Sequence, residues 1–170
     1  MLRTTLLTAL TATLLIADVP VLKTGQTIIY KKGDDGSYSK ITGKAHSYIR
    51  NNTNGIVTDN ATKLQWQDNT SSQKKNWLSA KEYCATLNLN GGNWRLPTVY
   101  ELKSIVDYSQ NNPPINKTAF KYLKAVPYWS STAFAGDSTL AWSVNFFKDG
   151  IGSASQRTNK HIRVKCVRNQ

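Results

Sequence analysis

The stretch NWLSAKEYCATL, residues 76–87, predicts an amphipathic helix that carries one of the two cysteines of the chain. Its apolar residues, three and four positions apart, are Trp77, Ala80, Cys84 and Leu87. This spacing places them on one face of a helix. Asn76 is the expected N-cap, because its side chain can accept a backbone N–H of the first turn. We therefore expect Cys84 to point into the core.

A second helix is predicted directly after the WRLP stretch of residues 94–97. Thr98 and Glu101 fit a capping box, in which each side chain accepts a backbone N–H at the start of the helix. The apolar residues that follow would form its buried stripe, and they are Leu102, Ile105 and Val106. The break at residues 111–114 ends this helix.

The segments on either side of the helices predict short β-strands. Asn54-Gly55 is a strong turn dipeptide, and it precedes short strands at residues 56–58 and 64–67. Further strands are expected at residues 128–132 and 142–146, with a hairpin turn at Asp149-Gly150. The fold class is therefore α+β, with two helices and a twisted antiparallel sheet.

The last predicted strand, residues 161–167, alternates apolar and basic side chains. Alternation would direct Ile162, Val164 and Cys166 to one side. It would direct His161, Arg163 and Lys165 to the other side. A row of basic groups on one strand face can meet successive anionic groups, although a solvated strand face without a ligand is the alternative.

The chain is predicted to have three parts: a signal peptide at 1–17, a polar, turn-rich lead-in at 18–45 and a folded domain at 46–170. Residues 6–16 are apolar but too short to span a bilayer, which is typical of an export signal. Cleavage is expected after Ala17, and a buried N-terminal helix is the alternative. No later segment is long and apolar enough for a membrane helix.

The lead-in offers two weaker signals. Residues 27–30 could form one short strand. The Asp34-Asp35 pair could indicate calcium, but two carboxylates without regularly spaced oxygen ligands favour a solvated turn. We therefore expect neither a metal nor a cofactor.

Export changes the interpretation of the two cysteines. In an exported chain, two cysteines favour a disulfide over a metal site, so Cys84 and Cys166 are predicted to be bonded. Two separate buried thiols, or a catalytic cysteine paired with His46 or His161, are the alternatives.

The charge of the chain points to an anionic partner. Lysine and arginine number 22 against 10 acidic residues, for a formal net charge of +12. A surface this basic attracts polyanions, which outside a cell include sulfated and uronic polysaccharides. A basic surface that serves only solubility is the alternative. The candidate ligand-binding residues are Arg157, Lys160, His161, Arg163, Lys165 and Arg168.

Taken in order, these motifs resemble the bacterial domain family named after the C-terminal domain of the Legionella collagen-like adhesin. The resemblance rests on residues 54–60, 64–67, 77–84, 94–102, 128–132, 142–146 and 166–168. It implies a C-type-lectin-like fold, in which a disulfide commonly ties the first helix to the final strand. Calcium-binding lectins of that fold carry a Trp-Asn-Asp strand, from which residues 142–145 depart.

The resulting functional expectation is an exported, adhesin-like or envelope-associated binding module for anionic or sulfated glycans. The namesake adhesin is thought to bind sulfated glycosaminoglycans, which is what the resemblance implies here. A structural or protein-binding subunit of a surface assembly is the alternative. An enzyme is not expected, because no pair of carboxylates stands out as a glycosidase site would require. The compartment would be the periplasm, the cell surface or the medium.

Overall fold

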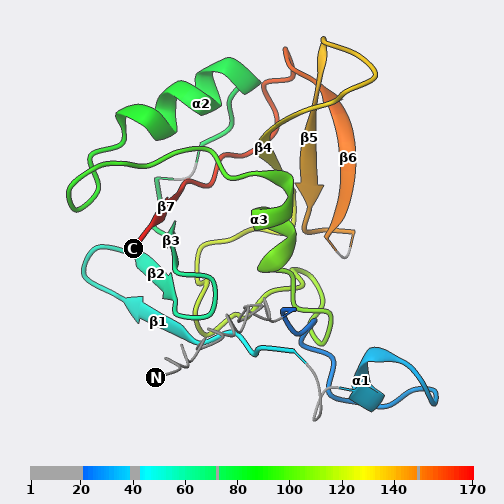
Figure 1. Cartoon of the computed structure of the whole chain (residues 1–170). Coiled ribbons are helices and arrows are strands. Elements are labelled where there is room, and N and C mark those ends of the chain that lie inside the picture. Colours follow the sequence, from blue (N-terminus) through cyan, green and yellow to red (C-terminus); the bar gives the residue numbers. More distant parts are fainter. Residues whose placement is uncertain (1–20, 39–42, 72, 149) are drawn as a thin grey trace, which may run out of the picture.

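The computed structural model describes residues 21–38, 43–71, 73–148 and 150–170. The predicted signal peptide and Asp149 of the predicted hairpin turn lie outside these ranges. Within them the chain is α+β, with three helices and seven strands, arranged as in Figure 1. One disulfide joins Cys84 to Cys166. The strand pairs within its sheets are all antiparallel.

A four-stranded sheet joins the beginning of the domain to the end of the chain. Its strands are β1 (Tyr48–Asn51), β2 (Ile56–Asp59), β3 (Leu64–Gln67) and β7 (Val167–Asn169), in the order β1-β2-β3-β7. The turn between β1 and β2 needs Gly55, whose φ is +68° and whose added Cβ would lie 2.7 Å from the Cβ of Asn69. The predicted turn dipeptide and strand at 64–67 are thus confirmed.

A separate three-stranded sheet comprises β4 (Pro127–Ala133), β5 (Leu140–Asn145) and β6 (Ile151–Gln156), in the order β4-β5-β6. The described strands therefore form two sheets, where the sequence predicted one. In β5, Ala141 and Ser143 are buried and Trp142 is only partly buried, although simple alternation would have buried Trp142.

The helices fill the space around the two sheets. Helix α2 (Trp77–Thr86) starts at Asn76, whose side chain accepts the N–H of Ser79. Helix α3 (Val99–Ser104) starts with the predicted capping box. The buried side chains of α3 pack with residues of both sheets, so that α3 lies between them (Figure 1).

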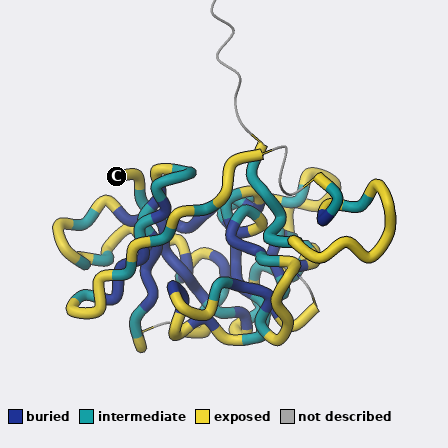
Figure 2. The backbone as a smooth tube through the Cα atoms, turned by 90° about the horizontal axis from the view of Figure 1, so that it is seen from below, coloured by how far each residue is buried: buried dark blue, intermediate teal, exposed yellow. Residues whose placement is uncertain are grey.

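A second core cluster holds α2 against β4 and the end of the chain. It contains the disulfide between Cys84 and Cys166, whose Cα atoms are 5.5 Å apart. Figure 2 shows the buried segments gathered inside, with exposed loops around them. The predicted pairing and the inward direction of Cys84 are confirmed.

The lead-in forms turns and one short helix, α1 (Asp35–Tyr38). The strand predicted at residues 27–30 is wrong. The Asp34 carboxylate accepts the N–H groups of Tyr30 and Lys31 at 2.8 and 3.1 Å, so these donors serve a turn and not a strand ladder. Burial on its own would raise the pKa of Asp34, but these and the Ser37 hydrogen bonds lower it to about 2.

The strand predicted at residues 161–167 is also incorrect, because β7 begins only at Val167. The preceding segment runs between two other parts of the chain. Its Arg163 N–H donates to the carbonyl of Pro127, and its Val164 N–H donates to that of Gln73. Alternation still holds for Ile162, Val164 and Cys166, all of which are buried.

Candidate functional site

Lys165 does not belong to an exposed row of basic groups. Its side chain is 5% exposed, and its Nζ lies 2.8 Å from Oδ1 of Asp68 and 2.8 Å from the carbonyl oxygen of Gln67. The ring of Phe120 lies 5.3 Å away. The expectation that Lys165 faces a ligand is therefore wrong, because a buried carboxylate draws this ammonium inward.

Asp68 is the centre of this buried network. Its second oxygen accepts from Arg50 Nη1 at 2.5 Å and from the backbone N–H of Lys121 at 2.8 Å. Burial on its own would raise the pKa of Asp68, but the charge of Lys165 and the hydrogen bonds from Lys165 and Arg50 hold it below its ordinary value. The carboxylate is thus ionised at neutral pH and ties β3 to the C-terminal segment.

Arg168 also serves the structure. Its guanidinium lies 4.7 Å from the ring centroid of Trp94 and donates to Gln65 Oε1 at 2.8 Å. It also donates to the carbonyls of Asn90 and Gly92 at 2.8 and 2.9 Å. With four such partners, Arg168 anchors the loop after α2 and has little capacity left for a ligand.

The other four predicted residues lie beside the start of α2. Two backbone hydrogen bonds hold residues 157–163 against residues 74–77: Trp77 N–H donates to the carbonyl of Arg157, and Lys75 N–H donates to that of Ile162. Lys74 and Arg163 form an isolated bridge. This contact adds basic residues that the sequence did not single out. We call the combined set the basic surface, and it consists of Lys74, Lys75, Lys81, Arg157, Lys160, His161 and Arg163.

Trp77 organises the middle of the basic surface. The Arg157 guanidinium lies 4.3 Å from its ring centroid and the Lys81 ammonium lies 4.7 Å from it. The indole N–H donates to the carbonyl of Ser130 at 2.7 Å, which fixes the ring. Cation–π contacts of this kind hold charges in place while leaving their hydrogen-bond donors available. Lys74, Lys160 and His161 are exposed around this centre.

A shallow groove of about 580 Å³ adjoins the basic surface at Lys81. Arg95 lines it and pairs with Glu101 through two hydrogen bonds of 2.8 and 2.6 Å. Arg95 is therefore one partner of a structural ion pair. The hydrogen bonds that Arg95 donates to Glu101 raise the pKa of Arg95, against the effect of its partial burial.

The aromatic residues of β4 belong to the core. Tyr128 and Trp129 are 1% and 0% exposed. Within the described residues no group of three or more His, Cys, Asp or Glu side chains gathers as a metal site would require. None of the helices formed by these residues has the length and apolar character needed to span a bilayer.

Lys74, Lys75 and Lys81 were missed because their proximity to the C-terminal segment is tertiary. The available signal was the Lys74-Lys75 pair directly before the predicted helix. Basic residues at the start of a helix are unfavourable for its dipole, so their presence calls for another explanation.

The structure thus defines a disulfide-bonded α+β domain, with the basic surface gathered around Trp77 at the start of α2. The family model of the Lcl C-terminal domain matches residues 55–168. The chain therefore belongs to the Lcl C-terminal domain family, as its motifs predicted. A search of curated proteins found no match to it.

Proposed function

We propose that this protein is an exported binding module that holds anionic or sulfated glycans on its basic surface. The observation that carries the proposal is the contact between residues 74–77 and 157–163, which gathers basic groups from two distant segments around Trp77. Such groups can meet successive sulfates along a polysaccharide. Outside the cell, sulfated chains are among the polyanions that such a basic surface attracts.

The electrostatic setting supports an anionic ligand. The chain carries a net charge of +12. This region also contains two acidic residues, Glu82 on α2 and Asp137 near Arg157. Hydrogen bonds from Thr139 and the charge of Arg157 lower the pKa of Asp137. An excess of fixed cations steers polyanions to a surface and makes the affinity depend on salt.

Export and a C-type-lectin-like fold are part of this proposal. A disulfide is typical of exported proteins, because the cytosol keeps thiols reduced. The bond from Cys84 in α2 to Cys166, directly before β7, supports the lectin-like arrangement that the family resemblance implies. We expect no enzymatic activity, because no pair of carboxylates stands out in the sequence as a glycosidase site would require.

The test is the affinity for heparin, measured across a series of salt concentrations. A triple variant, Lys74→Glu, Lys81→Glu and Lys160→Glu, should bind at least about tenfold more weakly at 0.15 M salt and show a shallower salt dependence. A control variant with the same charge change outside the basic surface, Lys117→Glu, Lys124→Glu and Lys148→Glu, should remain closer to wild type. Uncharged dextran should not bind to this surface.

Two results would contradict the proposal. An equal loss of heparin affinity in both triple variants would mean that net charge alone determines binding and that the basic surface is not the binding site. Wild-type protein that fails to bind at physiological salt would exclude anionic glycans. That result would leave a protein partner in a surface assembly as the better explanation.

A further inference from the structure

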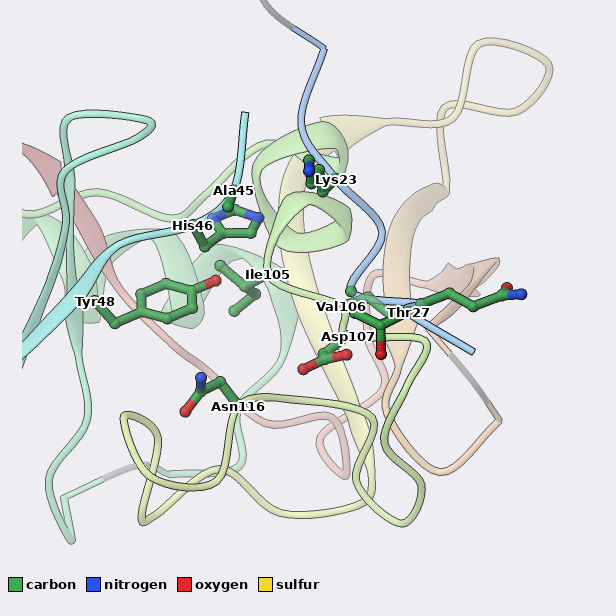
Figure 3. Close-up of a pocket in the computed structure, with 11 residues that line it drawn as sticks. Lys23, Thr27, Ala45, His46, Tyr48, Ile105, Val106, Asp107 and Asn116 are labelled. Carbon is green, nitrogen blue, oxygen red and sulfur yellow. The ribbon is translucent and has the colours of Figure 1, made fainter. Parts of the chain in front are cut away.

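A cavity of about 320 Å³ lies between the lead-in and the core of the domain, and it shares no residue with the basic surface. We call it the lead-in pocket (Figure 3). The residues that line it are Lys23, Gly25, Gln26, Thr27, Ala45, His46, Tyr48, Ile105, Val106, Asp107 and Asn116. Its size lies at the lower end of the range of about 300–1,000 Å³ for small-molecule pockets.

Backbone hydrogen bonds fix the wall that the lead-in contributes. Lys23 N–H donates to the carbonyl of Lys44 at 3.0 Å, and Tyr108 N–H donates to that of Thr24 at 2.9 Å. Gly25 has a φ of +87°, and a Cβ added there would lie 2.1 Å from the Asp107 carboxylate. The lead-in is therefore fitted to the domain at the pocket, where only glycine allows the close approach.

His46 lines this pocket and has one ring nitrogen without a hydrogen-bond partner. Its Nδ1 lies 2.7 Å from Oδ2 of Asp59, while its Nε2 is buried without a hydrogen-bond partner. Burial on its own would raise the pKa of Asp59, but hydrogen bonds from His46, Thr62 and the Ala61 N–H lower it. Because ionised Asp59 can only accept, Nδ1 carries the proton of this hydrogen bond, and Nε2 is the ring nitrogen left without a partner.

The other polar groups converge from different elements. In Figure 3 the hydroxyl of Tyr48 points to the middle of the group, with His46 on one side and Asn116 on the other. The imidazole stacks on the Tyr48 ring at 5.1 Å. Burial raises the pKa of Tyr48, and the charges of Asp59 and Asp107 raise it further, so the phenol stays protonated and can donate.

The arrangement excludes several kinds of ligand. Carboxylates at Asp59 and Asp107 disfavour an anion, and the Lys23 ammonium in the lining disfavours an organic cation. A purely apolar molecule would leave Nε2 of His46 and the Tyr48 hydroxyl without partners, which costs about 1–3 kcal/mol for each group. The aliphatic side chains of Ile105 and Val106 line the pocket and can contact one apolar face of a ligand.

A neutral molecule whose hydroxyl groups both donate and accept fits all of these features. We propose that the lead-in pocket binds one neutral, hydroxyl-rich ring of the size of a single sugar residue, with hydroxyls on His46, Tyr48 and Asp107 and the ring face on Ile105 and Val106. This site goes beyond the proposed function, because it is separate from the basic surface. Its affinity does not depend on salt, since the ligand is uncharged.

The experiment is a titration of the ¹⁵N-labelled protein followed by backbone amide shifts. The probes are methyl glycosides of glucose, galactose, mannose, fucose, N-acetylglucosamine and N-acetylgalactosamine, each at 0.15 and 0.5 M sodium chloride. Sodium sulfate and tetramethylammonium chloride serve as the charged comparison probes. At least one glycoside should give saturable shifts at Gly25, His46 and Asp107, with equal affinity at both salt concentrations.

Tyr48→Phe keeps the ring stacking and removes only the hydroxyl, so it should weaken that glycoside about fivefold, in line with one lost hydrogen bond of about 1 kcal/mol. Tyr100→Phe is the matched control, because Tyr100 is exposed on α3 and does not line the pocket. It should bind like wild type. Heparin binding should be unchanged in both variants, which separates this site from the basic surface.

The inference is overturned if no glycoside gives saturable shifts at the pocket amides, or if Tyr48→Phe binds the responding glycoside like wild type. It is also overturned if sulfate or tetramethylammonium saturates these amides and the glycosides do not. Loss of heparin binding in the Lys74, Lys81 and Lys160 variant would leave the result for the pocket unaffected, so the two proposals fail independently.

Discussion

At the scale of single residues, Lys165 shows how burial overrides a local pattern. Strand alternation places its side chain opposite Val164 and Cys166, facing outward. The structure instead buries it against Asp68, a residue 97 positions away in the sequence. Nothing within a few residues of Lys165 announces that partner, so the inward direction could not be predicted from the local sequence.

This burial predicts a large structural effect at a position that looks like surface. Lys165→Met removes the ammonium and leaves Asp68 with Arg50 as its remaining charged partner, so unfolding free energy should fall by about 3 kcal/mol. Because the pKa of Asp68 is lowered in the folded state, its ionised form stabilises the fold above about pH 3.8 and that stabilisation is lost as the pH falls through the folded pKa. The cost of Lys165→Met should therefore be full at pH 7 and shrink below about pH 3.8.

Urea unfolding followed by tryptophan fluorescence at pH 7 and pH 3 measures this difference. Lys160→Met is the control, because Lys160 is exposed and its removal should change stability by less than about 0.5 kcal/mol. Equal stability of the two variants at pH 7 would show that Lys165 is not part of a buried network.

At the scale of elements, the sequence correctly predicted the helix caps and the strand that depend on neighbouring residues. The Thr98–Glu101 capping box, the Asn76 cap and strand β3 all occur where the sequence places them. Strand β6 was not predicted, since its small and polar residues pair with β5 but bury little. The segment before β7 has the alternating sequence of a strand. The structure shows that this segment is hydrogen-bonded to neighbouring segments on two sides, which bury its apolar side chains without making it a strand.

The disulfide is the covalent link between α2 and the end of the chain. It closes a loop with a sequence separation of 82 residues. Chain entropy assigns such a crosslink about 4–5 kcal/mol, because it restricts the unfolded ensemble. The double variant Cys84→Ala, Cys166→Ala should therefore lose about this much unfolding free energy in urea. A loss below about 1 kcal/mol would contradict it, and wild type reduced with dithiothreitol gives an independent measurement of the same loss.

At the scale of the whole molecule, neither of the two proposed ligand sites is encoded by one stretch of sequence. The basic surface needs residues 74–81 beside residues 157–163, and the lead-in pocket needs the lead-in, β1 and the loop after α3. Charge and the C-terminal basic residues pointed to the first site. Nothing in the spacing of His46, Tyr48 and Asp107 pointed to the second, because the fold alone brings them together.

The folding unit should accordingly be longer than the matched family region of residues 55–168. Strand β1 lies outside that region and pairs with β2 inside it. Arg50 and His46 also lie outside it, and they form ion pairs with Asp68 and Asp59 inside it. A fragment of residues 55–170 leaves both buried carboxylates with fewer partners, so it should be at least about 3 kcal/mol less stable than residues 21–170. A fragment of residues 46–170 keeps both ion pairs and should lie between the two, losing only the contacts of the lead-in. Urea unfolding of the three fragments measures this order, and a fragment 55–170 with the same midpoint as residues 21–170 would show that β1 and its ion pairs contribute nothing to the fold.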